Sequence, residues 1–245
     1  GSIAIGSNIY LKGYGPNTVI GYNAMVNNDN TTYSGRNYNT LIGYEVLNKN
    51  VTGSSNTIIG HQAGYNNTTG YSNTSVGSSS LINNTSGSSN VGIGKDSLQQ
   101  NTTGFGNVAV GSGSLNSTKT DNYNTALGHY AGFNSTGTYN ISLGAYAGYS
   151  MKGDNNIAIG QYSCNNVRGS NKICIGANSG PPVNSIYDKY EDNYERIFIG
   201  SQSKFNGGDA VLEVHNLDTK RTTAGSGYSD NFGTAHSYFC NFGNS

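Results

Sequence analysis

The sequence predicts an all-β protein, a repetitive parallel β-roll or β-solenoid of about twelve coils with 16–17 residues each. The first observation is the motif Asn-x-x-x-Gly, whose closing glycine returns every 17 residues from Gly43 to Gly128 and every 16 residues from Gly128 to Gly176. A unit this short cannot bury its own apolar face and must stack on its neighbours. The second observation is that apolar residues recur at fixed positions relative to this glycine; the residues at one such position in successive units are called a column. The twelve closing glycines are Gly6, Gly21, Gly43, Gly60, Gly77, Gly94, Gly111, Gly128, Gly144, Gly160, Gly176 and Gly200.

Each unit is expected to contain a short strand directly before its glycine. The residue before the glycine is Ile, Val or Leu, and the third residue before it is mostly Thr, Val or Ile. These side chains share one strand face, and their β-branching favours a strand over a helix. The residue between them, such as Val19, Ile58 or Ala109, faces the other way and is mostly apolar. One face then fills the coil, and the other needs a cover, for which a partner chain, packed or intertwined in a homotrimer, is the simplest source.

Two further columns predict corners. Asn stands four residues before the glycine in nine of the twelve units. Asn accepts a left-handed backbone and bonds to local amides, and a residue repeated once per coil can form a ladder with a spacing of about 4.8 Å. A second glycine column, seven residues before the first, predicts another corner. The expected structural ladder consists of Asn56, Asn73, Asn90, Asn107, Asn124, Asn140 and Asn156.

The period breaks at two insertions and ends before the C-terminus. We expect the β-roll over residues 1–204, with insertions near 27–38 and 181–196. Residues 205–245 are expected to form a terminal strand followed by an aromatic-rich cap, a tip or the start of a truncated next domain.

Segments that interrupt a solenoid often carry its binding sites. A tyrosine ring can stack on the apolar face of a sugar while its hydroxyl bonds a wet partner. In the regular coils we expect tyrosines to be spread singly, without such clusters. The expected ligand-binding residues are Tyr187, Tyr190 and Tyr194 in the second insertion and Tyr228, His236 and Tyr238 in the C-terminal part.

Composition and motifs weigh against several function classes. The 245 residues carry a formal net charge of zero and no basic patch, so no nucleic-acid partner is expected. No apolar run has the length of a membrane span, so no membrane insertion is expected. The chain has no recognisable metal, cofactor or catalytic motif, and we expect no metal, no cofactor and no enzyme activity.

Three further expectations, on two cysteines, one isoleucine and the threonine column, follow from the repeat positions. Cys164 and Cys174 lie at different phases of neighbouring coils, so we expect free buried thiols and no bridge between them. Ile159 belongs to the invariant apolar column, so Ile159→Asp is expected to prevent folding or assembly. The threonine column is expected to point inward; it comprises Thr18, Thr40, Thr57, Thr74 and Thr125.

A resemblance to fibre proteins is carried by the segments NTIIGHQAG (56–64), NTALGHYAG (124–132), NISLGAYAG (140–148) and NNIAIG (155–160). They resemble the β-roll heads of YadA-type trimeric adhesins and, more closely, the NTxIGxxAG repeats of phage tail fibres and related bacterial or viral fibre proteins. The resemblance covers about residues 3–204 and departs from the adhesin heads in its longer period. It implies a left-handed roll, a homotrimer, an extracellular place on a cell surface or virion fibre, and a cell-surface glycan or receptor as partner.

The leading hypothesis is a non-enzymatic fibre segment that attaches to a cell surface or acts as a spacer in a trimeric fibre. The alternative is a trimeric polysaccharide depolymerase of a tail fibre, in which the 181–196 loop would supply a carboxylate pair such as Glu191 and Asp192. A third hypothesis is an ice-binding solenoid based on the threonine column.

Overall fold

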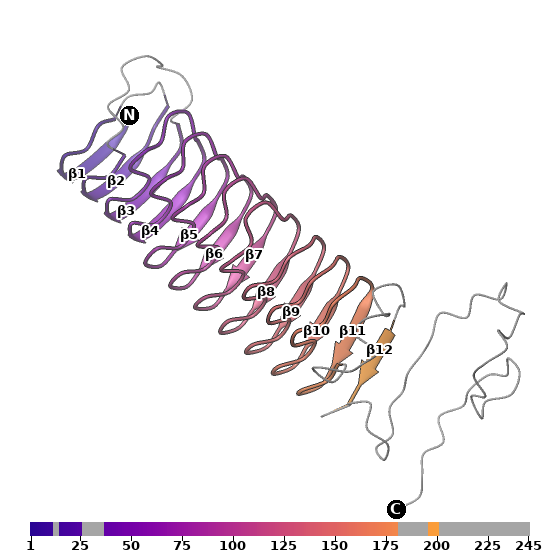
Figure 1. The fold of residues 1–245 in the computed structure, drawn as a ribbon. Coiled ribbons are helices and arrows are strands. Elements are labelled where there is room, and N and C mark those ends of the chain that lie inside the picture. Colours follow the sequence, from indigo (N-terminus) through magenta and orange to yellow (C-terminus); the bar gives the residue numbers. More distant parts are fainter. Residues whose placement is uncertain (12–14, 26–36, 181–195, 201–245) are drawn as a thin grey trace, which may run out of the picture.

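The structure is a computed structural model that describes residues 1–11, 15–25, 37–180 and 196–200. These residues form one parallel sheet of twelve strands, β1 to β12, in sequence order. The chain winds from each strand to the next as an elongated roll (Figure 1). The expected all-β parallel solenoid is confirmed, and the described residues contain no helix.

The strands are three to five residues long; β1–β4 run one residue past the repeated glycine, and β5–β12 end at the residue before it. They are β1 (Ile3–Ser7), β2 (Thr18–Tyr22), β3 (Thr40–Tyr44), β4 (Thr57–His61), β5 (Thr74–Val76), β6 (Val91–Ile93), β7 (Val108–Val110), β8 (Thr125–Leu127), β9 (Ile141–Leu143), β10 (Ile157–Ile159), β11 (Lys172–Ile175) and β12 (Arg196–Ile199).

The register of the sheet follows the sequence repeat. Gly21 pairs with Gly43, and Gly43 pairs with Gly60. Gly77 shows why the column must be glycine, because its φ is +136° and an added Cβ would lie 2.6 Å from the carbonyl oxygen of Gly94. Backbone therefore stacks directly on backbone at this corner, with no room for a side chain.

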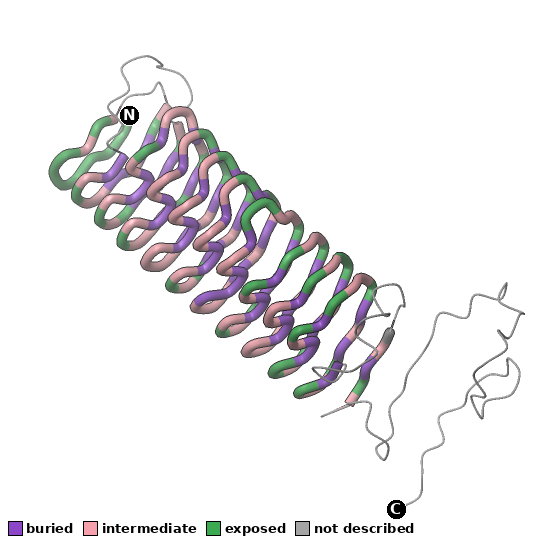
Figure 2. The backbone as a smooth tube through the Cα atoms, viewed as in Figure 1, coloured by how far each residue is buried: buried purple, intermediate pink, exposed green. Residues whose placement is uncertain are grey.

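In β2–β12 the residue two positions before the repeated glycine fills the interior of the roll. Val19, Leu41 and Ile58 are fully or almost fully buried. A second wall without strands closes the interior from the other side, and its Leu47 meets Ile58 beside Gly64. Figure 2 shows buried residues recurring at equivalent places along the axis.

The two outer columns of the strands face away from the interior, which corrects the expected inward direction of the threonine column. Thr57 is exposed, and Thr18, Thr40, Thr74 and Thr125 are half-buried and point outward with it. Ile159, at 36% exposure, lies on the same outer face and not in the core. The physical reason is strand alternation, because once the residue between them faces the interior, both outer columns must face outward. The inward residue is as large as Ile58 or Phe198 and is Ala, Ser or Gly in β5–β10, where leucines of the facing wall such as Leu98 fill the interior.

The asparagine ladder closes one edge of the interior. The side-chain oxygen of Asn90 accepts the backbone N–H of Asn107 at 3.0 Å, and its amide donates to the carbonyl of Gly104 at 2.8 Å. Each ladder side chain is at most 4% exposed. The left-handed backbone is at the preceding residue, for example Tyr123 before Asn124, so the asparagine braces the corner through its side chain.

A second asparagine column, which sequence reasoning missed, stands on the opposite wall of the 17-residue coils. Asn84 donates to the side-chain oxygen of Asn67 at 2.7 Å and to the carbonyl of Gly87 at 2.9 Å. The signal was present in the sequence as Asn-x-x-Gly at a 17-residue spacing. The column is Asn50, Asn67, Asn84 and Asn101.

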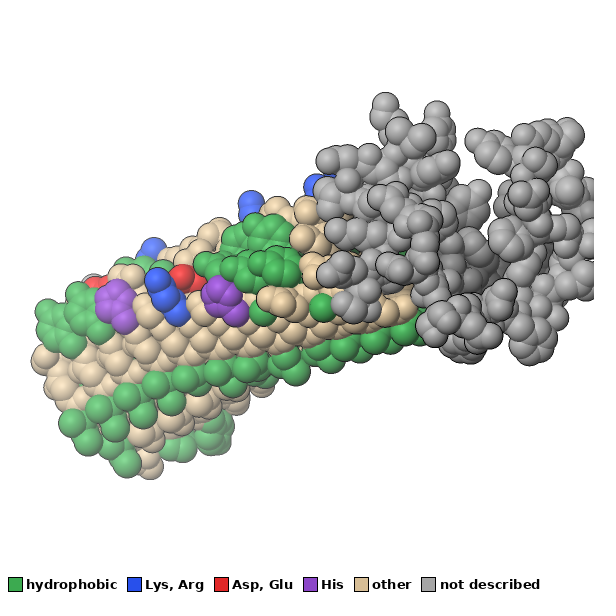
Figure 3. Space-filling view, turned by 90° about the horizontal axis from the view of Figure 1, so that it is seen from below, with side chains coloured by type: hydrophobic (Ala, Val, Ile, Leu, Met, Phe, Trp, Pro, Cys, Tyr) green, Lys and Arg blue, Asp and Glu red, His purple; other side chains and the backbone are tan. Residues whose placement is uncertain are grey.

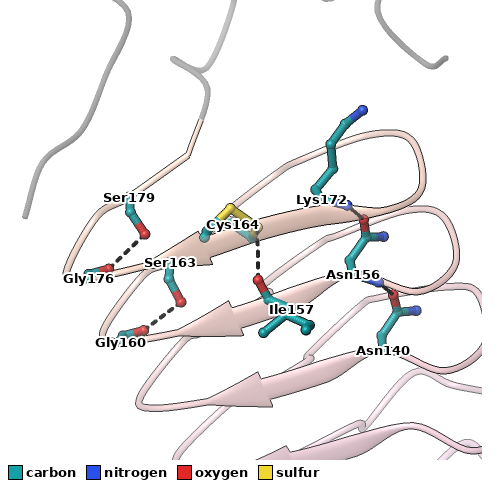
Figure 4. The surroundings of a disulfide bond; sticks show 10 residues. Asn140, Asn156, Ile157, Gly160, Ser163, Cys164, Lys172, Gly176 and Ser179 are labelled. Atoms are coloured by element: carbon teal, nitrogen blue, oxygen red, sulfur yellow. Dashed lines mark hydrogen bonds between the residues drawn. A yellow bond between two sulfur atoms is a disulfide. The ribbon is translucent and has the colours of Figure 1, made fainter. Parts of the chain in front are cut away.

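Cys164 and Cys174 form a disulfide, and the expectation of free thiols is wrong. Their Cα atoms are 5.5 Å apart. Cys174 is the inward residue of β11, and Cys164 lies on the wall facing it, so two different phases of the repeat meet across the same interior layer (Figure 4). Cys164 Sγ also lies 3.7 Å from the carbonyl oxygen of Ile157.

Candidate functional site

An exposed apolar face runs along the whole sheet. Figure 3 shows it as a continuous row of hydrophobic side chains. It is formed by the residue before each glycine, and it is two apolar side chains wide where the strand residue two positions earlier is Val or Ile and not Thr. Apolar surface arranged in one long uncovered patch marks an interaction site. Its members with 36–59% exposure are Ile3, Ile5, Ile42, Ile93, Leu127, Ile159, Ile175 and Ile199.

A second surface consists of stacked aromatic side chains. Tyr146 stacks on Tyr130 at a centroid distance of 5.5 Å and on Tyr162 at 4.8 Å. Phe133 stacks on Tyr149 beside them at 5.4 Å. The expectation that tyrosines of the regular coils are spread singly is therefore wrong. The 16-residue spacing of Tyr130, Tyr146 and Tyr162 was the signal that would have found this ladder.

Shorter aromatic ladders occur elsewhere on the roll. One places Tyr22, Tyr44 and His61 in a stack, and another places Phe105, Tyr123 and Tyr139 together. In such stacks neighbouring rings cover one another's faces, so a sugar could stack only at the ends of a ladder. The aromatic ladders therefore stabilise the surface of the roll more than they offer a binding platform.

A shallow, open groove of about 520 Å³, called the polar groove because polar and charged side chains line it, lies on the wall opposite the sheet. Two side-chain columns line it, one amide-rich and one threonine-rich, and both continue from coil to coil along the axis. The lining residues are Lys49, Asn66, Thr68, Asn83, Thr85, Gln100, Thr102 and Lys119.

The described carboxylates already serve local contacts. Asp154 accepts the backbone N–H of Thr138 at 2.7 Å, and Asp121 accepts that of Gly137 at 3.1 Å. A hydrogen bond from Gln62 lowers the pKa of Glu45. These carboxylates hold neighbouring coils together.

The neighbouring Tyr44 responds to that charge. The negative Glu45 carboxylate raises the pKa of the Tyr44 phenol above its usual value.

Within the described ranges, no group of three or more His, Cys, Asp and Glu side chains could hold a metal ion. No helix there is long and apolar enough to cross a membrane.

The expected binding residues Tyr187, Tyr190, Tyr194, Tyr228, His236 and Tyr238 lie outside the described residues, as do Glu191 and Asp192. The seven ladder asparagines do not form a site, because they are buried within the wall of the roll. The chain matches no family model, no curated protein and no solved structure.

Proposed function

We propose that the chain is a non-enzymatic segment of a homotrimeric fibre that serves attachment to a cell surface. The observation that carries this proposal is the uncovered apolar face, which runs along the sheet from Ile3 to Ile199. A long, narrow apolar stripe on a rod suits side-by-side packing of identical rods, because equal coil spacing keeps every contact in register.

The width of the stripe favours three copies. Around a common axis parallel to the rods, each chain of a trimer meets two neighbours. The two outer columns of each strand, for example Ile157 and Ile159 in β10, would then face different neighbours. Burying the exposed part of one such side chain contributes about 0.5–1 kcal/mol, and this contribution recurs at every strand.

The disulfide supports an extracellular place for this fibre. Bridges between cysteines persist in oxidising compartments and are rare in the reducing cytosol. Cys164 and Cys174 join the two walls near the end of the regular repeat, where a secreted rod would gain resistance to fraying.

The other two functions receive less support. The outward direction of the threonine column suits an ice-binding surface, but Val and Ile replace threonine in β6, β7 and β9–β11. For a depolymerase, the described carboxylates are engaged in local contacts, either with a neighbouring coil, as for Asp154, or within one coil, as for Asp96. Incubating the chain with candidate polysaccharides and sizing the products separates a binder from an enzyme, because an enzyme would shorten them.

Attachment is tested with fluorescently labelled chain on cells whose surface glycans differ. Replacing Tyr187, Tyr190 and Tyr194 together by Ser is expected to weaken attachment without changing the assembly. Unchanged attachment in this variant, and also after removal of residues 221–245, would move the binding site elsewhere. A chain that attaches to none of the cells would contradict the proposed role in attachment.

A further inference from the structure

The polar groove faces away from the apolar sheet face. Its residues belong to the strandless wall, which packs across the interior from the strands, as the meeting of Leu47 and Ile58 shows. Copies that pack through the sheet face would therefore leave the groove open to solvent.

The groove offers side-chain oxygen and nitrogen atoms in a regular line. Thr85 Oγ1 donates its proton to the carbonyl of Thr102 at 3.0 Å, and Thr68 does the same to Thr85 at 2.9 Å. Because these hydroxyl protons are engaged along the axis, their oxygen lone pairs remain as acceptors. Asn66 and Asn83, linked at 3.2 Å, line the other side with amide groups.

The charge in the groove is positive at both ends. Lys49 is the first groove residue of the amide-rich column, and Lys119 is the last groove residue of the threonine-rich column. No carboxylate lines the space between them. The Lys49 ammonium is held over the ring of Tyr65, 5.2 Å from its centroid. Beyond Lys119 the threonine-rich column continues through exposed Lys152 and Arg168.

We propose that this groove binds a linear acidic polysaccharide lying along the axis of the roll. Four coil steps separate the two lysines, which gives the groove a length of about 19 Å at about 4.8 Å per step. Sugar hydroxyls would donate to the threonine oxygens and bond the amides, while carboxylates of the sugar chain would meet the lysines at either end. This inference rests on the proposed function in cell attachment and names its ligand class.

Other polymers fit the groove less well. An extended peptide would add as a strand only to unpaired backbone, but the backbone here is already paired, as in the 2.8 Å bond from Thr85 N–H to the carbonyl of Thr102. A nucleic acid would need many phosphate contacts, and the groove holds two lysines. A hydroxyl-rich chain with few charges suits the lining best.

The test titrates the full chain calorimetrically with oligogalacturonates from dimer to octamer, with neutral maltooligosaccharides and with oligoglutamate. We expect binding of the galacturonates to strengthen until the oligomer spans the groove and then to level off. Lys49→Gln and Lys119→Gln should each weaken this binding about fivefold, as loss of a solvent-exposed ion pair implies. Thr85→Val, which keeps the shape of the side chain, should also weaken it.

Lys95→Gln is the matched control, because Lys95 lies outside the groove and pairs with Asp96 at 3.7 Å. Its galacturonate affinity should equal that of the wild type. Wild-type chain that binds no galacturonate, or groove variants that bind as the wild type does, would overturn the proposal. Tighter binding of oligoglutamate would assign the groove to an acidic peptide. Sedimentation of each variant separates this result from the proposed fibre role, because an intact trimer without galacturonate binding rejects the groove alone.

Discussion

Asn101 and Thr118 occupy equivalent positions in successive coils, but the buried side-chain oxygen of Asn101 has no hydrogen-bond partner. Thr118 donates its hydroxyl to Leu115 within its own coil at 2.6 Å. In the preceding coils an asparagine amide fills this role, as Asn101 does for Asn84 at 2.7 Å. The second asparagine ladder therefore ends at Asn101, whose side-chain oxygen lacks the amide donor that a further asparagine would supply.

The end of this ladder coincides with the loss of a glycine. Gly104 stands three residues after Asn101, and an added Cβ there would overlap the side-chain oxygen of that asparagine. The next coil has Asp121 at this place. An asparagine at position 118 would consequently be crowded by the Cβ of Asp121.

The first prediction concerns this pair. Thr118→Asn alone should lower stability, whereas Thr118→Asn added to Asp121→Gly should raise it by about 1–2 kcal/mol relative to Asp121→Gly alone, because a buried acceptor gains a donor. Urea unfolding of the wild type, both single variants and the double variant gives the coupling energy. Additive effects of the two substitutions would contradict the proposed steric link.

The second prediction concerns the aromatic ladder. Tyr146 lies between Tyr130 and Tyr162 and also contacts His129. Tyr146→Ala should destabilise the roll by about 1–3 kcal/mol, since several ring contacts are lost. Tyr146→Phe keeps the ring and serves as the control, with an expected change near zero. Equal unfolding midpoints for the Ala and Phe variants at one protein concentration would show that the stack contributes no stability.

The third prediction concerns the disulfide. Cys164 and Cys174 are separated by 10 residues, and closing a loop of that length contributes about 2–3 kcal/mol. A reducing agent should therefore lower the thermal midpoint of the wild type. Cys174→Ala, which places in β11 the residue that β7, β8 and β10 already carry at this position, should melt at the same temperature with and without reductant. A wild-type midpoint indifferent to reduction would count against a stabilising bridge.

The repeat made the sheet predictable because each strand position recurs with the same residue class. It was harder to predict which strand face lines the interior, since Ile159 and Ala158 are both apolar and either could do so. Residue size does not decide between them, because the inward column holds Ile58 in β4 and Ala158 in β10.

Contacts across the interior were the part that the sequence concealed. Cys164 and Cys174 lie at different phases of the repeat, and their meeting depends on how the strandless wall folds back over the sheet. The groove was missed for a similar reason. Its two columns are ordinary Asn and Thr residues, and only the fold shows that they lie side by side between Lys49 and Lys119.

The central claim is that the apolar sheet face is an interface between identical chains. Sedimentation equilibrium of the wild type, Ile159→Asp and Ala158→Asp tests it most directly. Ile159 is exposed in one chain and Ala158 is fully buried, although both belong to β10. The account predicts a wild-type mass three times the 25.7 kDa of one chain, a folded monomer for Ile159→Asp, and an unfolded chain for Ala158→Asp, whose carboxylate would be buried without a partner. A wild type that stays monomeric at every concentration, or an Ile159→Asp variant that assembles as the wild type does, would contradict the account.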